Sequence, residues 1–353
     1  MGSEFEYAAE AARKRGFGNL AELYDRMAAA SNPVEPGKSE KPRICLVYTT
    51  SNWCEERLSR ELASQFSGYD CRMVAGGDGT YLGFGDDIYL VRSIGRIPRS
   101  VPDWARKRIV AMIQSDRSFD SPSQYDRWSS AAVVVAQNRH LQERARSLGI
   151  VVHDQIIANG VNLEEFHPSG RCQDEFIVGA SGNFSSDYFD EWKGFSRYIV
   201  PACRMAGVRL KWCGWKGTCP RFPDIPGEHI PLEKMGEWYR SLSCLVSMSK
   251  SEGCSGAVFE AMASGIPVIS TKVGWHSDVC SDELIWANRP NDATPENVDA
   301  SVKDLAMKIR ALRDNRSICK LLGEKARAFA EQWPHSRISD QWRVIIGEIQ
   351  SRG

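Results

Sequence analysis

The sequence predicts an α/β protein of two domains, and three observations support that prediction. The chain has 353 residues, which is more than one hydrophobic core usually supports. Short apolar runs typical of buried strands alternate with segments of helical spacing, as in parallel sheets covered by helices. In the C-terminal half, residues 247–271 read as a strand end, a glycine-bearing loop, a helix and a second strand.

The N-terminal domain is predicted from its apolar runs. A first strand is expected at 43–48, followed by a helix through Gln65. Residues 1–42 read as a cloning tag, an amphipathic helix and a linker. Together with intervening helices, four more buried strands would complete a compact parallel sheet; they are expected at 88–91, 109–113, 131–135 and 152–158.

The glycine-bearing loop is the most informative part of the chain. A strand at 243–248 leads into the loop 251–256, and a helix at 257–264 follows. Gly265 can take the left-handed conformation that closes a helix, before the next strand at 268–271.

A loop of small residues at a helix start presents unpaired backbone N–H groups at the positive end of the helix dipole. Such a loop is a binding place for a phosphate or diphosphate. Glu252 stands just before it and Glu260 about one turn into the helix, so both carboxylates can lie beside one ligand. Because carboxylates repel phosphates, we expect them to bind hydroxyl groups. A nucleotide sugar carries hydroxyls at both ends of its diphosphate.

This segment resembles the Glu-x7-Glu signature of retaining, family 4-like glycosyltransferases with the GT-B fold. The resemblance implies two Rossmann-like domains facing a cleft, with a C-terminal helix that crosses back to the N-terminal domain. We therefore expect an acceptor domain at 43–155, a nucleotide-sugar domain at 156–333 and a crossover helix at 334–353. The alternative for the last segment is a further helix of the C-terminal domain.

Other segments are similar to the same family. Residues 156–168, with Asn-Gly-Val and Phe-x-Pro, look like its interdomain segment, and 176–184 like the strand and glycine turn that meets the diphosphate. Lys193-Gly matches a Lys-Gly element whose lysine offsets phosphate charge. Many relatives carry an arginine in the glycine turn, where this chain has Asn183.

The resemblance also implies roles for single residues. Glu252 would orient the donor sugar and Glu260 would bind ribose. Lys193, with Gly182 and Asn183, would stabilise the leaving diphosphate. The remaining phosphate contacts would come from the backbone amides of Gly253, Cys254, Ser255 and Gly256.

The donor would be a nucleoside-diphosphate sugar, with UDP or GDP as the nucleotide, and the resemblance implies neither a tightly bound cofactor nor a metal. Relatives often end the strand that corresponds to 109–113 with a His-Asp pair near the sugar. This chain has Gln114-Ser-Asp116 there, so Asp116 is a candidate for holding a substrate hydroxyl without the histidine.

The chain has a net charge of zero that is unevenly spread. Between Arg92 and Arg146, eleven basic residues face five acidic ones, an excess of +6, with aromatic residues interleaved. We expect this region to bind a polyanionic acceptor, either DNA carrying a modified base or a phosphate-bearing lipid or glycan at a membrane surface. The alternative is a solvated surface balanced by the other domain.

Two other functions remain open. The chain could be a module that binds a nucleotide sugar without turnover. The run Gly76-Gly-Asp78-Gly-Thr80 also resembles the nucleotide site of NAD and diacylglycerol kinases. With neither a membrane-spanning apolar run nor an apolar signal core, we expect a cytoplasmic protein that can also bind peripherally at a membrane.

Overall fold

The structure, a computed structural model, divides into two compact α/β units. It describes residues 10, 13–14, 41–49, 54–76, 81–82, 85–93, 96–98, 100–119, 125–170, 174–182, 187–214, 222, 224–225 and 227–352. The first unit takes in residues up to Ile157 and from Ser339 on, and the second runs from Ala158 to Ile338. Most of the expected N-terminal helix and linker lies outside the described residues, as do Asp78 and Asn183.

The first unit is built on a parallel five-stranded sheet in the order β2-β1-β3-β4-β5. Its strands are β1 (Arg43–Tyr48), β2 (Asp70–Ala75), β3 (Ile88–Val91), β4 (Ile109–Ile113) and β5 (Val133–Ala136). The helices between them are α3 (Cys54–Gln65), α4 (Asp103–Arg106), η3 (Asp116–Phe119), α5 (Tyr125–Trp128) and α6 (Arg139–Ser147).

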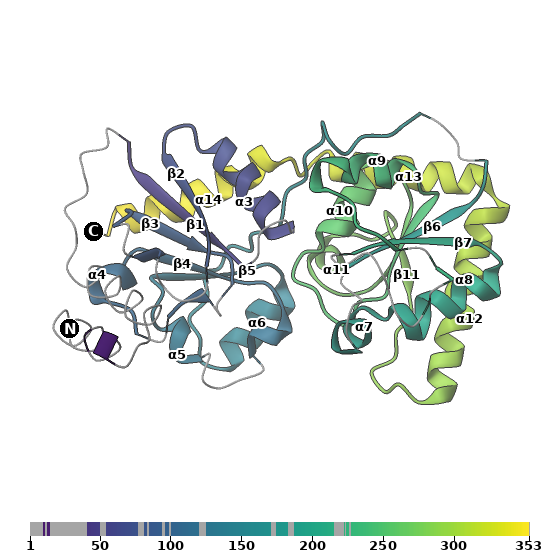
Figure 1. The fold of residues 1–353 in the computed structure, drawn as a ribbon, viewed down its shortest axis with the longest axis horizontal. Helices are drawn as coiled ribbons and strands as arrows, with labels where there is room; N and C mark the ends of the chain where they lie inside the picture. The colour runs from purple at the N-terminus through teal and green to yellow at the C-terminus, as the bar shows by residue number, and fades with distance from the viewer. Residues whose placement is uncertain are drawn as a thin grey trace. The chain divides into compact units, whose positions relative to one another are not determined.

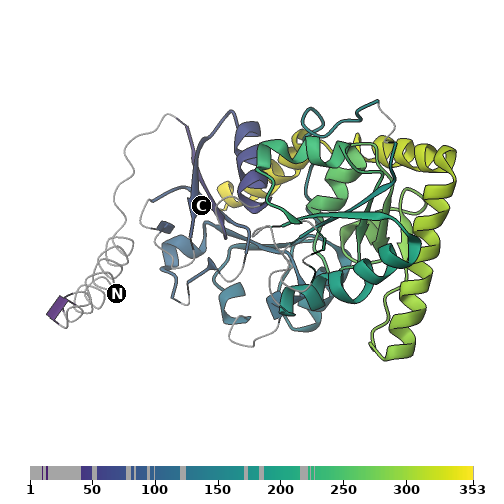
Figure 2. The same cartoon turned by 45° about the vertical axis from the view of Figure 1, so that its right-hand side comes forward.

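The two faces of this sheet are covered by different helices. Alternate residues of β1, such as Cys45 and Val47, pack with Leu141 and Ala145 of α6. Figures 1 and 2 show α14 (His335–Gln350, yellow) beside α3 (purple). A hydrogen bond from Arg343 of α14 to the carbonyl of Gln65, at the end of α3, connects the two helices.

The second unit is a parallel six-stranded sheet in the order β11-β10-β9-β6-β7-β8. Its strands are β6 (Ile177–Ser181), β7 (Arg209–Cys213), β8 (Gly227–Glu228), β9 (Cys244–Ser247), β10 (Val268–Thr271) and β11 (Ile285–Ala287). Counted along the unit, these strands lie in the order 3-2-1-4-5-6, which is the order of the doubly wound dinucleotide-binding fold.

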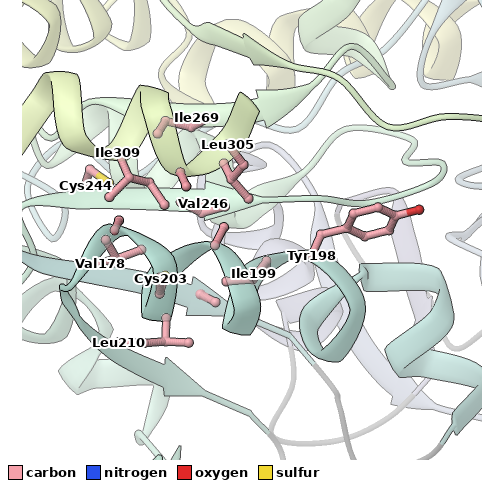
Figure 3. Close-up of a cluster of buried hydrophobic side chains, with 14 of the residues drawn as sticks. Val178, Tyr198, Ile199, Cys203, Leu210, Cys244, Val246, Ile269, Leu305 and Ile309 are labelled. Carbon is pink, nitrogen blue, oxygen red and sulfur yellow. The ribbon is translucent and has the colours of Figure 1, made fainter. Parts of the chain in front are cut away.

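Helices cover both faces of the second sheet. They are α7 (Asp187–Lys193), the π-helix η5 (Phe195–Ile199), α8 (Val200–Ala206), η6 (Leu232–Lys234), α9 (Met235–Arg240), α10 (Gly256–Ala263), α11 (Trp275–Val279), α12 (Pro295–Asp314) and α13 (Arg316–Ala330). Figure 3 shows one apolar layer, in which Ile199, Cys203, Leu305 and Ile309 gather around Val246. Fully buried aliphatic side chains of this kind supply most of the stability of a layer.

The structure differs from the sequence prediction at three places. Residues 70–75 form a strand that was not predicted, because polar Asp70 and Arg72 alternate with apolar residues on this edge strand. The expected strand at 152–158 was wrong, since Ile156 makes only an isolated bridge to Ala136. In the sequence, residues 305–333 alternate apolar and charged side chains at helical spacing, but the structure breaks this stretch at Asn315, whose side chain caps α13 by accepting a bond from the amide of Ile318.

Candidate functional site

The site predicted from the sequence lies where ligands bind in sheets of this type. In a doubly wound sheet the ligand sits outside the carboxyl ends of the strands, at the point where the strand order reverses. In the second unit that point lies between β6 and β9, which are hydrogen-bonded neighbours. The chain leaves β6 at Gly182 and leaves β9 toward Glu252, so the topology brings the two predicted segments to one edge.

The helix that follows the loop was predicted at 257–264; it starts one residue earlier, at Gly256, and ends one residue earlier, at Ala263. Ser255 heads α10 in an extended conformation and makes no side-chain capping bond in the described structure. The first amides of an α-helix have no acceptor within the helix, so those of α10 point toward the loop. At the other end, Gly265 has φ +70°, and its amide donates to the carbonyl of Met262.

The predicted residues Glu252 and Lys193 are brought together, although 59 residues separate them. Lys193 Nζ lies 2.5 Å from Glu252 Oε1, and the Ser249 hydroxyl donates to the same oxygen at 2.6 Å. Both charged side chains are partly buried. The pair therefore places one cation and one carboxylate directly before the amide-lined start of α10.

Three contacts fix the backbone that carries Glu252. The amide of Trp275 donates to the carbonyl of Gly253 at 2.7 Å. Gly274, at φ +73°, packs so closely that an added Cβ would lie 2.9 Å from the Cβ of Glu252. From the other side, the buried amide of Asn159 donates to the carbonyl of Cys254 at 2.7 Å. The Asn-Gly element noted in the sequence thus holds the loop in place.

Glu260 lies on the same side of α10 as the loop. Its side chain is only 7% exposed. A Cβ built on Gly256 would meet Glu260 Oε1 at 3.5 Å, so the carboxylate reaches back toward the first turn of the helix. Both glutamates of the sequence motif are therefore near the helix start, one before it and one beside it.

Arg289 fixes the turn that carries Lys193. Its guanidinium, on a side chain 7% exposed, donates to the carbonyls of Glu191, Trp192 and Met248. It also lies over the ring of Tyr198, 5.1 Å from the ring centre. Burial lowers the pKa of Arg289 from its ordinary value. This arginine ties the end of α7 to the residue that follows β9.

Gly194 is required by the same arrangement. It has φ +70°, and an added Cβ would lie 2.8 Å from the carbonyl oxygen of Met248 and 3.1 Å from Arg289 Nη1. Gly194→Ala should therefore destabilise the second unit by about 2 kcal/mol or more, from backbone strain plus the clash. Urea unfolding at equilibrium measures the change.

Gly170→Ala is the matched control for this prediction. Gly170 also has a left-handed backbone, at φ +68°, but a Cβ there meets nothing within 4 Å. Its replacement should cost only the strain, about 1–2 kcal/mol. Equal losses in the two variants would show that the close packing around Gly194 contributes nothing.

The glycine turn after β6 is described as far as Gly182. Its amide donates to the carbonyl of Cys213 at 3.0 Å, and a Cβ on Gly214 would lie 2.4 Å from the carbonyl oxygen of Gly182. Two glycine backbones therefore approach closely at this edge of the sheet. Asn183, which was expected to continue the turn, lies outside the described residues.

Asp116, the remaining predicted site residue, belongs to the first unit. It begins η3 directly after β4, and its Oδ1 accepts a hydrogen bond from Arg144 at 2.6 Å. His140 Nε2 lies 3.0 Å from the same oxygen. A histidine therefore does contact Asp116, but it comes from α6 and not from position 115.

His276 adjoins the loop as a buried aromatic residue. It packs edge to face on Phe259 of α10, with ring centres 4.7 Å apart, and burial lowers its pKa from 6.5 to about 3. Between these two values the unfolded chain binds a proton that the folded chain does not. Stability should therefore fall as the pH falls, by about 2 kcal/mol between pH 7 and pH 5 from this residue alone.

His276→Phe tests this pH dependence. Urea unfolding of both proteins gives the decrease in the free energy of unfolding from pH 7 to pH 5. This decrease should be about 2 kcal/mol smaller in the variant than in the wild type. The comparison of differences removes any effect of the substitution that does not depend on pH. The same pH dependence in both proteins would contradict a neutral, buried His276.

Four supporting residues were not predicted as site residues: Asn159, Ser249, Gly274 and Arg289. The sequence does mark Asn159, because an Asn-Gly pair follows an apolar run there, but the same pair is typical of an ordinary turn. No local sequence pattern marks Arg289, since its contact with Trp192 joins residues that are 97 positions apart. Within the described part of the chain, no three His, Cys, Asp or Glu side chains form a possible metal site.

The segment that carries part of the candidate site matches a known protein family. Residues 224–315, which include Glu252, Glu260 and Arg289, match the family described as "Glycosyl transferases group 1". An uncharacterized glycosyltransferase of Methanocaldococcus jannaschii is 31% identical over 223 residues, which are 59% of this chain and 56% of that protein. The chain therefore spans little more than half the length of this curated relative.

Solved structures show the fold. Sucrose-phosphate synthase of Thermosynechococcus elongatus superposes with a TM-score of 0.68 at 15% identity, over 89% of this chain and 100% of that one. Anabaena HepE in complex with UDP-glucose gives a TM-score of 0.67 at 14% identity, over 87% and 99% of the two chains. The Staphylococcus aureus protein TarM, with fondaparinux, α-GlcNAc-glycerol and UDP, gives 0.56 at 17% identity, over 72% and 54%. The two parallel-sheet units thus form a GT-B fold, and the segment around the candidate site is similar to group 1 glycosyl transferases.

Proposed function

We propose that the protein is a retaining glycosyltransferase that moves a sugar from a nucleoside-diphosphate sugar to an acceptor hydroxyl. The observation that carries the proposal is the pair of Lys193 and Glu252, 2.5 Å apart at the amide-lined start of α10. This pair lies at the reversal point of a doubly wound sheet, where a diphosphate has backbone donors and a cation together.

Each residue has a role in the proposed reaction. The acceptor hydroxyl oxygen forms a bond to the anomeric carbon, and the bond from that carbon to the diphosphate breaks, with its electron pair leaving on the diphosphate. The proton of the acceptor hydroxyl passes to the departing diphosphate oxygen. Lys193 and the amides of Gly253 to Gly256 stabilise the charge that grows there. Glu252 orients the donor sugar, and Glu260 binds the ribose hydroxyls. Retention proceeds either by attack on the same face or through a short-lived covalent intermediate.

The donor is proposed to carry UDP or GDP. UDP is supported by HepE, which binds UDP-glucose and UDP, and by TarM, which binds UDP. The reaction is proposed to need no metal, because Lys193 supplies the charge beside the diphosphate. The ligands of TarM are a nucleotide and sugars, which favours a glycan or lipid-linked acceptor over the DNA considered from the sequence. Every described helix is too short or too polar to cross a membrane.

Thermal denaturation with a panel of donors tests the proposal. A ligand that binds only the folded protein raises its stability with the logarithm of ligand concentration. UDP-, GDP-, ADP- and CMP-linked sugars are compared at equal concentration, with EDTA present, and the best is then tested for release of its nucleotide. Stabilisation with release supports the transferase. If a donor stabilises the protein but no nucleotide is released with any acceptor, the protein is a binding module. If no donor stabilises it, both the transferase and the binding module are refuted.

A further inference from the structure

A second group of charged side chains lies in the first unit, at the edge where its parallel strands end. β4 and β5 are hydrogen-bonded neighbours, so the segments that follow Ile113 and Ala136 leave the sheet at the same edge. Asp116 lies in the first of these segments, at the start of η3. His140 and Arg144 lie four positions apart on α6, which follows the second, and so share one helix face.

All three side chains meet at one oxygen atom. Oδ1 of Asp116 accepts a bond from Arg144 Nη1 at 2.6 Å and lies 3.0 Å from His140 Nε2. The aspartate side chain is 15% exposed, whereas those of Arg144 and His140 are 40% and 67% exposed. The carboxylate is therefore largely covered, and the basic groups are turned to the solvent.

Arg144 is held on a second side as well. Its guanidinium lies over the ring of Phe119, 4.9 Å from the ring centre, and that ring stacks on the buried Trp128. A guanidinium carries five N–H groups, and the described structure uses one of them, toward Asp116. The others remain for a ligand, on a side chain whose orientation is already fixed.

The charge around this cluster favours an anion. Arg144 balances the charge of Asp116, and Arg117 and Arg139, which directly follow and precede members of the cluster in the sequence, add two positive charges to these segments. The stretch from Arg92 to Arg146 carries the excess of +6 noted above. The planar fork of arginine matches two oxygens of a phosphate, and such charge-assisted bonds are about twice as strong as neutral ones.

We propose that Arg144 and His140, oriented by Asp116, bind a phosphate group of the acceptor. The proposal rests on the proposed function in one respect, that this ligand is the acceptor of sugar transfer. Asp116 is then a positioning residue, and not the group that holds a substrate hydroxyl. The phosphate can belong to a soluble phosphorylated sugar or to a lipid headgroup, since both present the same oxygens.

The test follows the imidazole signals of His140 by NMR while inorganic phosphate is titrated. Saturating UDP is present so that inorganic phosphate cannot bind at the proposed donor site. If UDP does not bind, the titration is done with the Lys193→Met variant, in which the cation of that site is missing. Phosphate should shift the His140 signals, and Arg144→Gln should weaken its binding at least about tenfold through the loss of a charged hydrogen bond. Arg108→Gln is the matched control, because Arg108 also lies on an aromatic ring, that of Trp104, but precedes β4 at the opposite edge of the sheet. It should bind phosphate like the wild type.

Cosedimentation with vesicles identifies the source of the phosphate. Binding to phosphatidylglycerol but not phosphatidylcholine vesicles, lost in Arg144→Gln, indicates a lipid headgroup. Phosphate binding without vesicle binding indicates a soluble acceptor. Unshifted His140 signals, or equal phosphate affinity in the Arg144 and Arg108 variants, would overturn the proposal. A shift of His140 in a protein that binds no nucleotide sugar would refute the proposed function and leave the phosphate site standing.

Discussion

Glu252→Gln is expected to lower the rate of sugar transfer by at least about a hundredfold while leaving the protein folded. The substitution keeps the shape of the side chain and an oxygen that accepts the hydrogen bond from Ser249. It removes the negative charge of the carboxylate that pairs with Lys193. Since Glu252 is proposed to hold the donor sugar in position, the loss should appear mainly in kcat, with a smaller change in UDP affinity. Release of nucleoside diphosphate in the presence of acceptor measures it.

Glu237→Gln is the control for this substitution. Glu237 lies on α9 of the same unit, is exposed and pairs with Lys234 at 3.0 Å. Its replacement should change neither activity nor stability appreciably, because exposed ion pairs contribute little. If Glu252→Gln retained wild-type kcat, the proposed role of Glu252 in orienting the sugar would be wrong.

Lys193→Met is expected to have an effect of similar size, but on both donor binding and turnover. The leaving diphosphate gains charge as the glycosidic bond breaks, and loss of one fixed donor at such a position lowers kcat about 100- to 1000-fold. UDP itself should bind at least about tenfold more weakly, because a charged hydrogen bond is lost. Calorimetry with UDP and steady-state kinetics measure the two effects separately.

Two further variants separate the role of the charge from its effect on folding. Lys250→Met removes a nearby exposed lysine that lies over the ring of Trp192, and it should behave as the wild type. Lys193→Met also leaves Glu252 without its cation, which destabilises a partly buried carboxylate. The double variant with Glu252→Gln should recover stability but not activity. Recovery of activity in the double variant would show that Lys193 serves only to neutralise Glu252.

The sequence predicted the fold well where strands are buried on both faces. Apolar runs such as 43–48 and 109–113 became central strands of a parallel sheet, and the expected GT-B fold is confirmed. Prediction failed at the sheet margin. Polar Asp70 and Arg72 alternate with apolar residues on the edge strand β2, and within 152–158 only Ile156 makes a bridge. At an edge, hydrogen bonding decides which extended segment becomes a strand, and residue pattern does not reveal it.

The candidate site was predicted in part, for a similar reason. The loop, helix start and two glutamates are contiguous, so their chemistry can be read from local sequence. The residues that complete each cluster are distant in sequence. In the second unit, Asn159 holds the loop by contacting Cys254 across 95 positions, and in the first unit His140 reaches Asp116 across 24. Such contacts depend on which strands are neighbours and in which register, and these properties belong to the assembled sheet.

A crystal structure of the protein with a bound UDP-sugar tests the central claim most directly. The account predicts that the diphosphate lies within hydrogen-bond distance of the backbone amides of residues 253–256 and of Lys193 Nζ. It also predicts that the carboxylates of Glu252 and Glu260 contact the sugar and ribose hydroxyls. A donor bound away from the start of α10, or a ribose that does not contact Glu260, would contradict the account.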